Sequence, residues 1–338
     1  MFSYCSFQGP AARRRIGGLA AAALAAVLAM SGAAAAEAER VETRPVALNP
    51  SAPEQTEIHR LAYRGGLRLD SPHARFGGWS ALEVSADGTR AILISDKGRW
   101  LTARLDYDSL GRLAGLDGAE TGMLPGLDGE PLLEGGAYGD AESLAVGADG
   151  RLIVGFEKVH RLWSYPAGPP PFRGPAEDVP APTLVAGAPN NDGMEALATL
   201  PDGRLLIVTE GYSDAPDTVL GWLGGPAGWT PLRVATAGGY RPTGAASLAT
   251  GEVFLVERRF NPVDGVAIRI RRFAPGEIVA GGRLEGEVLA KLSPPLTVDN
   301  FEGIALRRAA GETLIYLLSD DNLRKTQRTL LLLFALPD

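Results

Sequence analysis

The chain has 338 residues, of which 45% are hydrophobic and 22% are charged, and its formal net charge is −7. Binding to nucleic-acid backbones relies on a basic surface, so this acidic balance excludes nucleic acid as an expected partner. Cys5 is the single cysteine, and therefore no disulfide within the chain can stabilise the fold.

Residues 1–36 have the pattern of a signal peptide. Three arginines, Arg13–Arg15, precede an uncharged apolar stretch at Ile16–Met30, and small residues follow at Ala34–Ala36. The apolar stretch is shorter than the ~20 residues that a membrane-spanning helix needs. We therefore expect cleavage, export to the periplasm or the medium by the Sec or the twin-arginine route, and no membrane span in the mature protein.

A short phrase recurs along the rest of the chain and ends each time in an apolar run. Its acidic slot recurs at intervals of 51 to 59 residues and is occupied by Glu83, Glu142, Glu195, Ala246 and Glu302. Several copies continue into an Asp-Gly pair and a second apolar run, which is the pattern of an antiparallel hairpin. A hairpin unit repeated at this period is typical of the blades of a β-propeller.

We therefore predict an all-β fold, with one β-propeller over residues 57–338 and a flexible lead-in over residues 37–56. Five blades are counted, and a sixth would require a degenerate unit within residues 258–299 or in the N-terminal segment. Residues 58–69 supply N-terminal strands that complete the last blade, which closes the ring and removes exposed edges. We expect a monomer.

Each hairpin should bring two acids to the same end, because the first strand begins with one and the antiparallel partner ends with the other. The expected pairs are Glu83 with Asp96, Glu142 with Glu157, Glu195 with Glu210, and Glu302 with Asp320. The fourth unit keeps Glu257 but has Ala246 in the other slot, which predicts a gap. Since the first strands of a propeller line its channel, the sequence predicts an acidic rim at one channel mouth.

Carboxylates that converge must raise their pKa values, pair with cations of the protein, or bind a metal ion. Calcium is the natural ion because it takes several oxygen ligands in irregular geometry. The alternative is that the acids hydrogen-bond to backbone amides and hold the ring together. The candidate metal ligands are Glu83, Asp96, Glu142, Glu157, Glu195, Glu210, Glu257, Glu302 and Asp320.

Basic residues follow several of these acids and are candidates for binding an anionic substrate: Lys97, Lys158 and Arg258. Candidate catalytic residues are Glu195, Glu302 and His160, the last as a proton donor. The sequence has no Gly-x-Ser-x-Gly elbow, which argues against a serine hydrolase. No glycine pair belongs to a nucleotide-binding fingerprint, so we expect no organic cofactor.

Ordered motifs cover almost the whole mature chain, and they are Gly77–Leu82, Ser95–Gly98, Asp140–Ala145, Phe156–Glu157, Asn191–Leu197, Val256–Arg258 and Asn300–Ala305. Together they resemble the phytase-like domain family, also described as esterase-like activity of phytase, over roughly residues 75–336. The family name borrows from calcium-dependent phytases, which are propellers that bind phosphate at an acidic, calcium-filled channel mouth. The resemblance implies an exported, bacterial-type propeller, and it transfers no catalytic residue.

Two functions follow from these expectations. The first is a metal-assisted hydrolase of phosphate esters that acts on a small anionic substrate at the acidic mouth. The alternative is a non-catalytic propeller that binds a ligand or a cell-envelope partner there, because a fold by itself does not determine function.

Overall fold

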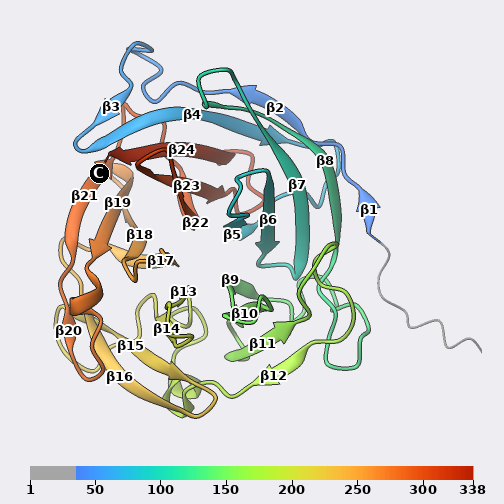
Figure 1. The fold of residues 1–338 in the computed structure, drawn as a ribbon, viewed down its shortest axis with the longest axis vertical. Helices are drawn as coiled ribbons and strands as arrows, with labels where there is room; N and C mark the ends of the chain where they lie inside the picture. Colours follow the sequence, from blue (N-terminus) through green and yellow to red (C-terminus); the bar gives the residue numbers. More distant parts are fainter. Residues whose placement is uncertain (1–35, 338) are drawn as a thin grey trace, which may run out of the picture. The chain divides into compact units, whose positions relative to one another are not determined.

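The structure is a computed structural model that describes residues 36–337. Five antiparallel sheets form a ring around a central axis, as Figure 1 shows. Their innermost strands contact one another in cyclic order, and these strands are β5 (Trp79–Val84), β9 (Ala141–Val146), β13 (Ala196–Thr199), β17 (Arg241–Ser247) and β22 (Asn300–Ala309). The predicted all-β, five-blade propeller is confirmed. The predicted signal peptide falls outside the described residues, except for Ala36.

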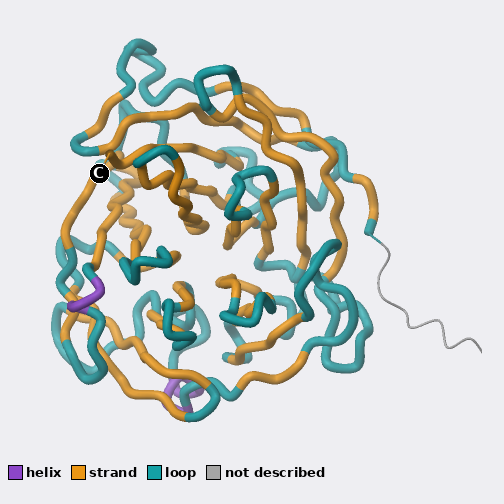
Figure 2. The backbone as a smooth tube through the Cα atoms, in the orientation of Figure 1, coloured by secondary structure: helices purple, strands orange, loops and turns teal. Residues whose placement is uncertain are grey.

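Each blade continues outward as a meander of further strands (Figure 2). Blade 1 adds β6 (Arg90–Ser95), β7 (Arg99–Tyr107) and β8 (Leu113–Met123). Blade 2 adds β10 (Leu152–Phe156), β11 (Arg161–Tyr165) and β12 (Glu177–Val179). Blade 3 adds β14 (Leu205–Val208), β15 (Thr218–Gly225), β16 (Gly228–Ala235) and the parallel β20 (Arg283–Leu284). Blade 4 adds β18 (Val253–Asn261), β19 (Gly265–Phe273) and β21 (Glu287–Leu292).

Blade 5 combines both ends of the described chain. β22, β23 (Glu312–Asp320) and β24 (Thr329–Pro337) are followed by β4 (Leu61–Asp70) and then by β2 (Glu42–Pro45). The short β3 (Glu57–Ile58) also pairs with β4. This junction closes the ring with antiparallel hydrogen bonds, as the N-terminal strands were expected to do.

Residues 37–56 differ from the flexible lead-in that the sequence suggested. They contain β2, which pairs with β4, and β1 (Glu37–Ala38), which pairs with β8 at the outer edge of blade 1. The outer edge of a blade carries unpaired backbone groups, and an added strand satisfies them. The lead-in therefore extends two blades.

The core consists of five buried apolar clusters, each lying between two neighbouring blades. The Asp-Gly turns of blades 1 to 3 have the predicted positive φ, which is 78° at Gly88, 80° at Gly150 and 83° at Gly203. The two short 3-10 helices, Thr183–Gly187 and Pro275–Glu277, lie in connections. Within residues 36–337, no helix has the length and apolarity that crossing a membrane requires.

Candidate functional site

A β-bulge interrupts the beginning of the inner strand in four blades. The residue that the bulge leaves unpaired is Ser80 in β5, Glu142 in β9, Thr243 in β17 and Glu302 in β22. Glu195, immediately before β13, has the equivalent place in blade 3. Such a bulge breaks the alternation of the strand and re-aims one side chain. We call Glu142, Glu195 and Glu302 the inner acids.

The inner acids meet at the channel axis. Together with Ser80 and Gly244 they line a cavity of about 10 Å³, which is close to the space that one water molecule requires. Thr243 instead turns its hydroxyl to the backbone and donates a hydrogen bond to the Phe301 carbonyl at 3.0 Å. The ring of inner acids is therefore open at blade 4, and also at blade 1, where Ser80 holds the bulge.

The register corrects two sequence predictions. Glu83 pairs with Ile92 near the hairpin turn, whereas Trp79 pairs with Ser95, so the predicted pairing of Glu83 with Asp96 is wrong. In blade 4, Ala246 pairs with Phe254, several residues away from the mouth, and Thr243 holds the bulge instead. Both errors arise because the repeats were aligned by residue type alone. That alignment ignored the bulge, which fixes the register of the inner strand.

In four blades an acid ends or closely follows the second strand at the mouth. We call these residues the outer acids, and they are Asp96, Glu157, Glu210 and Asp320. Counted from the bulge, the equivalent position in blade 4 is held by Arg258, and Glu257 precedes it by one residue. The Asp96, Glu157 and Glu210 amides each donate a hydrogen bond to a carbonyl of the first strand or the segment before it, at 2.9 to 3.0 Å. The predicted hairpins of Glu142 with Glu157, Glu195 with Glu210 and Glu302 with Asp320 are present.

The predicted basic residues lie at the same mouth and pair with acids there. Lys97 donates to the Asp96 carboxylate. The Lys158 ammonium lies 2.8 Å from Asp140 Oδ1. Arg258 Nη2 lies 2.9 Å from Glu210 Oε1.

Glu257 comes one residue before Arg258, so its side chain faces the opposite side of the strand from the position of the outer acids. Its side chain is fully buried, and both carboxylate oxygens accept hydrogen bonds from Arg269 and Arg271, at 2.6 to 2.8 Å. The two arginines were not singled out in the sequence. They stand two positions apart in β19, so both side chains face the same side of the strand. This spacing is the feature of the sequence that could have identified them. Glu257 is thus bound within the protein.

The inner acids have no ion-pair partner among the described residues, and Glu302 is partly compensated by the charge of Arg258 and a hydrogen bond from Asn300. Within residues 36–337, no lysine or arginine nitrogen lies within ion-pair distance of Glu142, Glu195 or Glu302, because the basic groups of the mouth pair with outer acids or with Asp140. Burial, followed by repulsion from other acids, raises the pKa of all three well above the usual value.

Burial raises the pKa of the outer acid Asp96, and it raises the pKa values of two further outer acids to near neutral pH. Burial, with added repulsion from Asp140 and Glu210, raises the pKa of Glu157 to about 8. Burial, with added repulsion from Asp96, raises the pKa of Asp320 to about 7. These carboxyl groups take up protons near neutral pH unless a cation from outside the protein offsets their charge.

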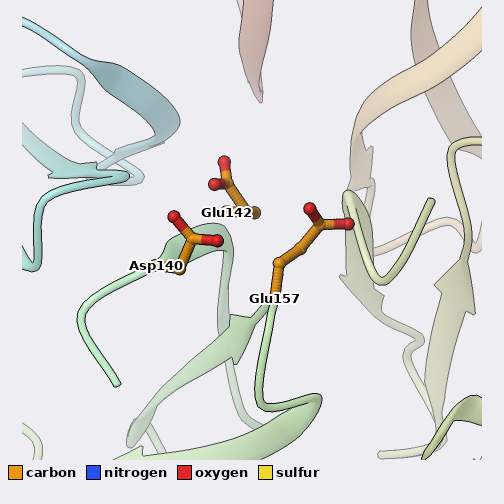
Figure 3. Close-up of side chains that lie close together, drawn as sticks. All are labelled: Asp140, Glu142 and Glu157. Carbon is orange, nitrogen blue, oxygen red and sulfur yellow. The ribbon is translucent and has the colours of Figure 1, made fainter. Parts of the chain in front are cut away.

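Three acids of blade 2 form the tightest group. Asp140, Glu142 and Glu157 each offer an oxygen, and these oxygens lie within 4.8 Å of one another. Figure 3 shows the three side chains projecting from the same part of the blade. Two ligands at the usual calcium–oxygen distance of ~2.4 Å are separated by at most about twice that distance, so the spacing fits a calcium ion. A purely carboxylate set suits calcium better than zinc.

Asp96 also has a feature that suits a cation-binding site. Its Oδ1 is buried and has no hydrogen-bond partner among the described residues. An unpaired buried carboxylate oxygen is costly and is suited to hold a cation. Repulsion from Asp96 contributes to the raised pKa of Glu142, which places Asp96 in the electrostatic surroundings of the triad.

His160 lies next to the triad. Its Nε2 is 3.2 Å from the Ala188 carbonyl, and its buried Nδ1 has no hydrogen-bond partner within residues 36–337. Gly193 lies between this ring and Glu157, because a Cβ at Gly193 would be 2.4 Å from the His160 ring and 2.7 Å from Glu157 Oε1. The Gly193 amide donates to Glu157 Oε1 at 2.5 Å. A glycine here lets the histidine approach the acids.

Glu83 lies elsewhere in the channel. It lines a separate cavity of about 130 Å³ with Ala145, Val146, Thr199 and Ala246. Burial raises its pKa to about 8. The structure therefore brings seven of the nine candidate metal ligands to one mouth, while Glu257 is bound by arginines within blade 4 and Glu83 lies apart.

A family model described as phytase-like, esterase-like activity of phytase, matches residues 74–323. No curated protein matches the sequence. Among solved structures, a gluconolactonase from Xanthomonas campestris is 13% identical, with 89% of this chain and 96% of that chain covered and a TM-score of 0.41. A virginiamycin B lyase from Staphylococcus aureus is 10% identical, with 88% and 100% covered and a TM-score of 0.40. We draw nothing about chemistry from likenesses this distant.

Proposed function

The chain belongs to the phytase-like family, and we propose that it is a metal-assisted hydrolase of phosphate esters. The observation that carries the proposal is the group of Asp140, Glu142 and Glu157, whose oxygens lie within 4.8 Å of one another. An acidic group of this kind binds a hard divalent cation well and repels anions until it does so.

Asp140, Glu142 and Glu157 would hold a calcium ion, with Asp96 beside them. Binding would displace the protons that the raised pKa values of Glu142 and Glu157 favour. The bound ion would supply positive charge that offsets the negative charge developing on the phosphate. Calcium is abundant outside the cytoplasm, and we propose that the leader exports the protein to the periplasm or the medium.

The basic residues of the mouth would bind the phosphate. Lys97, Lys158 and Arg258 each pair with one acid, and Lys158 keeps 44% of its side chain exposed. Charge-assisted hydrogen bonds from such groups orient a phosphate oxygen. Partly exposed cations can turn from their own carboxylates to an incoming anion.

Proton transfer would fall to Glu195, Glu302 or His160. Glu195 and Glu302 have pKa values well above the usual range, so their carboxyl groups would donate hydrogen bonds to a leaving oxygen. His160 is the other candidate, since its Nδ1 lies beside Glu157 without a partner among the described residues.

The first experiment is thermal melting with and without calcium, followed by phosphatase assays. We expect calcium to raise the melting temperature, because an ion that binds only the folded state must stabilise it. We expect calcium-dependent turnover of p-nitrophenyl phosphate, lost in Glu195→Gln or Glu302→Gln at unchanged melting temperature. Absence of both effects would overturn the proposal. Stabilisation without turnover of any phosphate ester would favour the ligand-binding propeller.

A further inference from the structure

A cleft of about 730 Å³ opens beside the acidic mouth, between blades 4 and 5. Arg258 and Phe260 of β18 line one side, and Asn300 of β22 lies where the cleft meets the mouth. Residues of the β23–β24 connection, Arg324 among them, line another side. A volume of this size accommodates a small organic molecule.

Two residues connect the cleft to the acids. Arg258 lines the cleft and also hydrogen-bonds to Glu210 at 2.9 Å. Asn300 donates from Nδ2 to Glu302 Oε1 at 2.8 Å, and its buried Oδ1 has no partner among the described residues. A molecule in the cleft would therefore lie next to Glu302 and within reach of the mouth.

The charge of the cleft favours an anion. The lining of the cleft contains three guanidinium groups, those of Arg258, Arg324 and Arg328, and one carboxylate, that of Asp299. Arg258 is paired with Glu210, and Arg328 Nε lies 3.1 Å from Asp299 Oδ2. Arg324 is exposed and has no ion pair within residues 36–337. The cleft thus offers one uncommitted cation at a distance from the metal-binding acids.

The wall of the cleft also has an apolar part. Phe260 is 66% exposed although it belongs to a strand, and Val266, Pro294 and Val298 line the same cleft. A cleft with an exposed aromatic ring and an uncommitted cation in its lining fits a ligand that has both an apolar body and a negative charge. A fully phosphorylated polyol would leave this apolar surface without a partner.

We propose that the cleft binds the organic group of the substrate, an aryl phosphate whose ring packs on Phe260 and whose second anionic group meets Arg324. This specificity rests on the proposed function, in which the phosphate itself lies at the acidic mouth. It makes Phe260 and Arg324 determinants of substrate choice, outside the catalytic machinery.

The test uses phosphonates, which cannot be hydrolysed, so binding is measured without turnover. Calorimetry on the full mature chain would compare methylphosphonate, phenylphosphonate and 4-carboxyphenylphosphonate, with and without calcium. We expect the ring to tighten binding about 10-fold through buried apolar area. We expect the carboxylate to add about 3-fold to 5-fold, a small gain because Arg324 is exposed.

Two variants assign these gains to residues. Phe260→Ser should remove the ring's advantage and keep that of the carboxylate, whereas Arg324→Gln should do the reverse. Lys325→Gln is the matched control, because it removes the same charge one residue away and Lys325 does not line the cleft. All three side chains are exposed, so melting temperatures should stay unchanged.

The outcomes separate the inference from the proposed function. Equal affinity for the three phosphonates, no detectable binding of any of them, or equal effects of Arg324→Gln and Lys325→Gln would overturn the inference even if calcium-dependent hydrolysis is found. Ring and carboxylate gains that persist without calcium, in a protein that calcium neither stabilises nor activates, would support the cleft and overturn the hydrolase.

Discussion

Glu157 in blade 2 and Glu257 in blade 4 both lie near the mouth end of a second strand, yet they stand one register position apart. Glu157 lies opposite Asp140, two residues before the bulge. Glu257 lies opposite Pro242, next to the bulge, and Arg258 holds the position equivalent to that of Glu157. Glu257 is bound on both oxygens by Arg269 and Arg271. Glu157 faces Asp140 and Glu142 instead, and its pKa is raised to about 8 mainly by burial.

The difference shows that the register at the bulge decides whether an acid of the second strand faces the mouth or the interior of its blade. The arginines of β19 neutralise Glu257 from within the protein. In blade 2 the nearest charged groups are other acids, with Lys158 bound to Asp140 alone. Glu257 is therefore neutralised within blade 4, and blade 2 is the place for an external cation.

The largest effect is expected from Glu257→Gln. This change leaves two guanidinium groups unpaired, and their side chains are only 7% and 4% exposed. Breaking a buried pair in this way costs about 3–5 kcal/mol of the free energy of unfolding. Urea denaturation measures the free energy of unfolding. A loss below about 1 kcal/mol would mean that the pairing of Glu257 with the two arginines does not stabilise blade 4.

Glu157→Gln should weaken calcium binding and leave the stability of the calcium-free protein unchanged. It removes one of several mutually repelling carboxylates, so the calcium-free protein should keep its stability. Calcium affinity should fall at least about 10-fold, because one charged ligand is lost. Calorimetry with calcium checks this, with Glu130→Gln as a control at an exposed carboxyl group. Unchanged affinity would remove Glu157 from the site.

The pH dependence of stability should reveal the uncompensated acids. The folded-state pKa is about 8 for Glu157 and about 7 for Asp320, both above their usual values. Their stabilising contribution is complete below about pH 4 and is lost as pH rises through about 7 to 8. We expect the calcium-free melting temperature to fall between pH 5.5 and 8, and the calcium-induced increase to grow. An increase that shrinks with pH would contradict the site.

The smallest effect is expected from Glu83→Gln. At pH 4 this buried carboxyl is protonated in the folded protein and largely so in the unfolded protein, since its folded-state pKa is raised to about 8, and glutamine is neutral and of similar size. Unfolding free energy should change by less than about 0.5 kcal/mol, and calcium affinity should stay the same. A marked loss of calcium binding would show that the channel interior belongs to the site.

The fold was predictable because its signals are local. Asp-Gly turns require positive φ, and a hairpin repeated at a constant period leaves little alternative to a ring of blades. The lead-in strands were not predicted, because β1 and β2 form only against edges that the finished blades provide. Short segments of this kind have no periodicity of their own to read.

The site was predictable only as far as the register was. Pairs such as Glu142 with Glu157 followed from antiparallel geometry alone. Glu83 and Ala246 were misplaced because bulges shift the register, and a one-residue shift changes which side chain faces the channel. The role of Glu257 depended on Arg269 and Arg271, partners on a neighbouring strand that only cross-strand pairing reveals.

The most direct test of the calcium site is the anomalous difference map of a crystal grown with calcium. We predict a peak within about 2.3–2.6 Å of oxygens from Asp140, Glu142 and Glu157. The same crystal form of Glu142→Gln should lack the peak. A calcium-grown crystal with no peak at these three carboxylates, or with the peak retained in Glu142→Gln, would contradict the site.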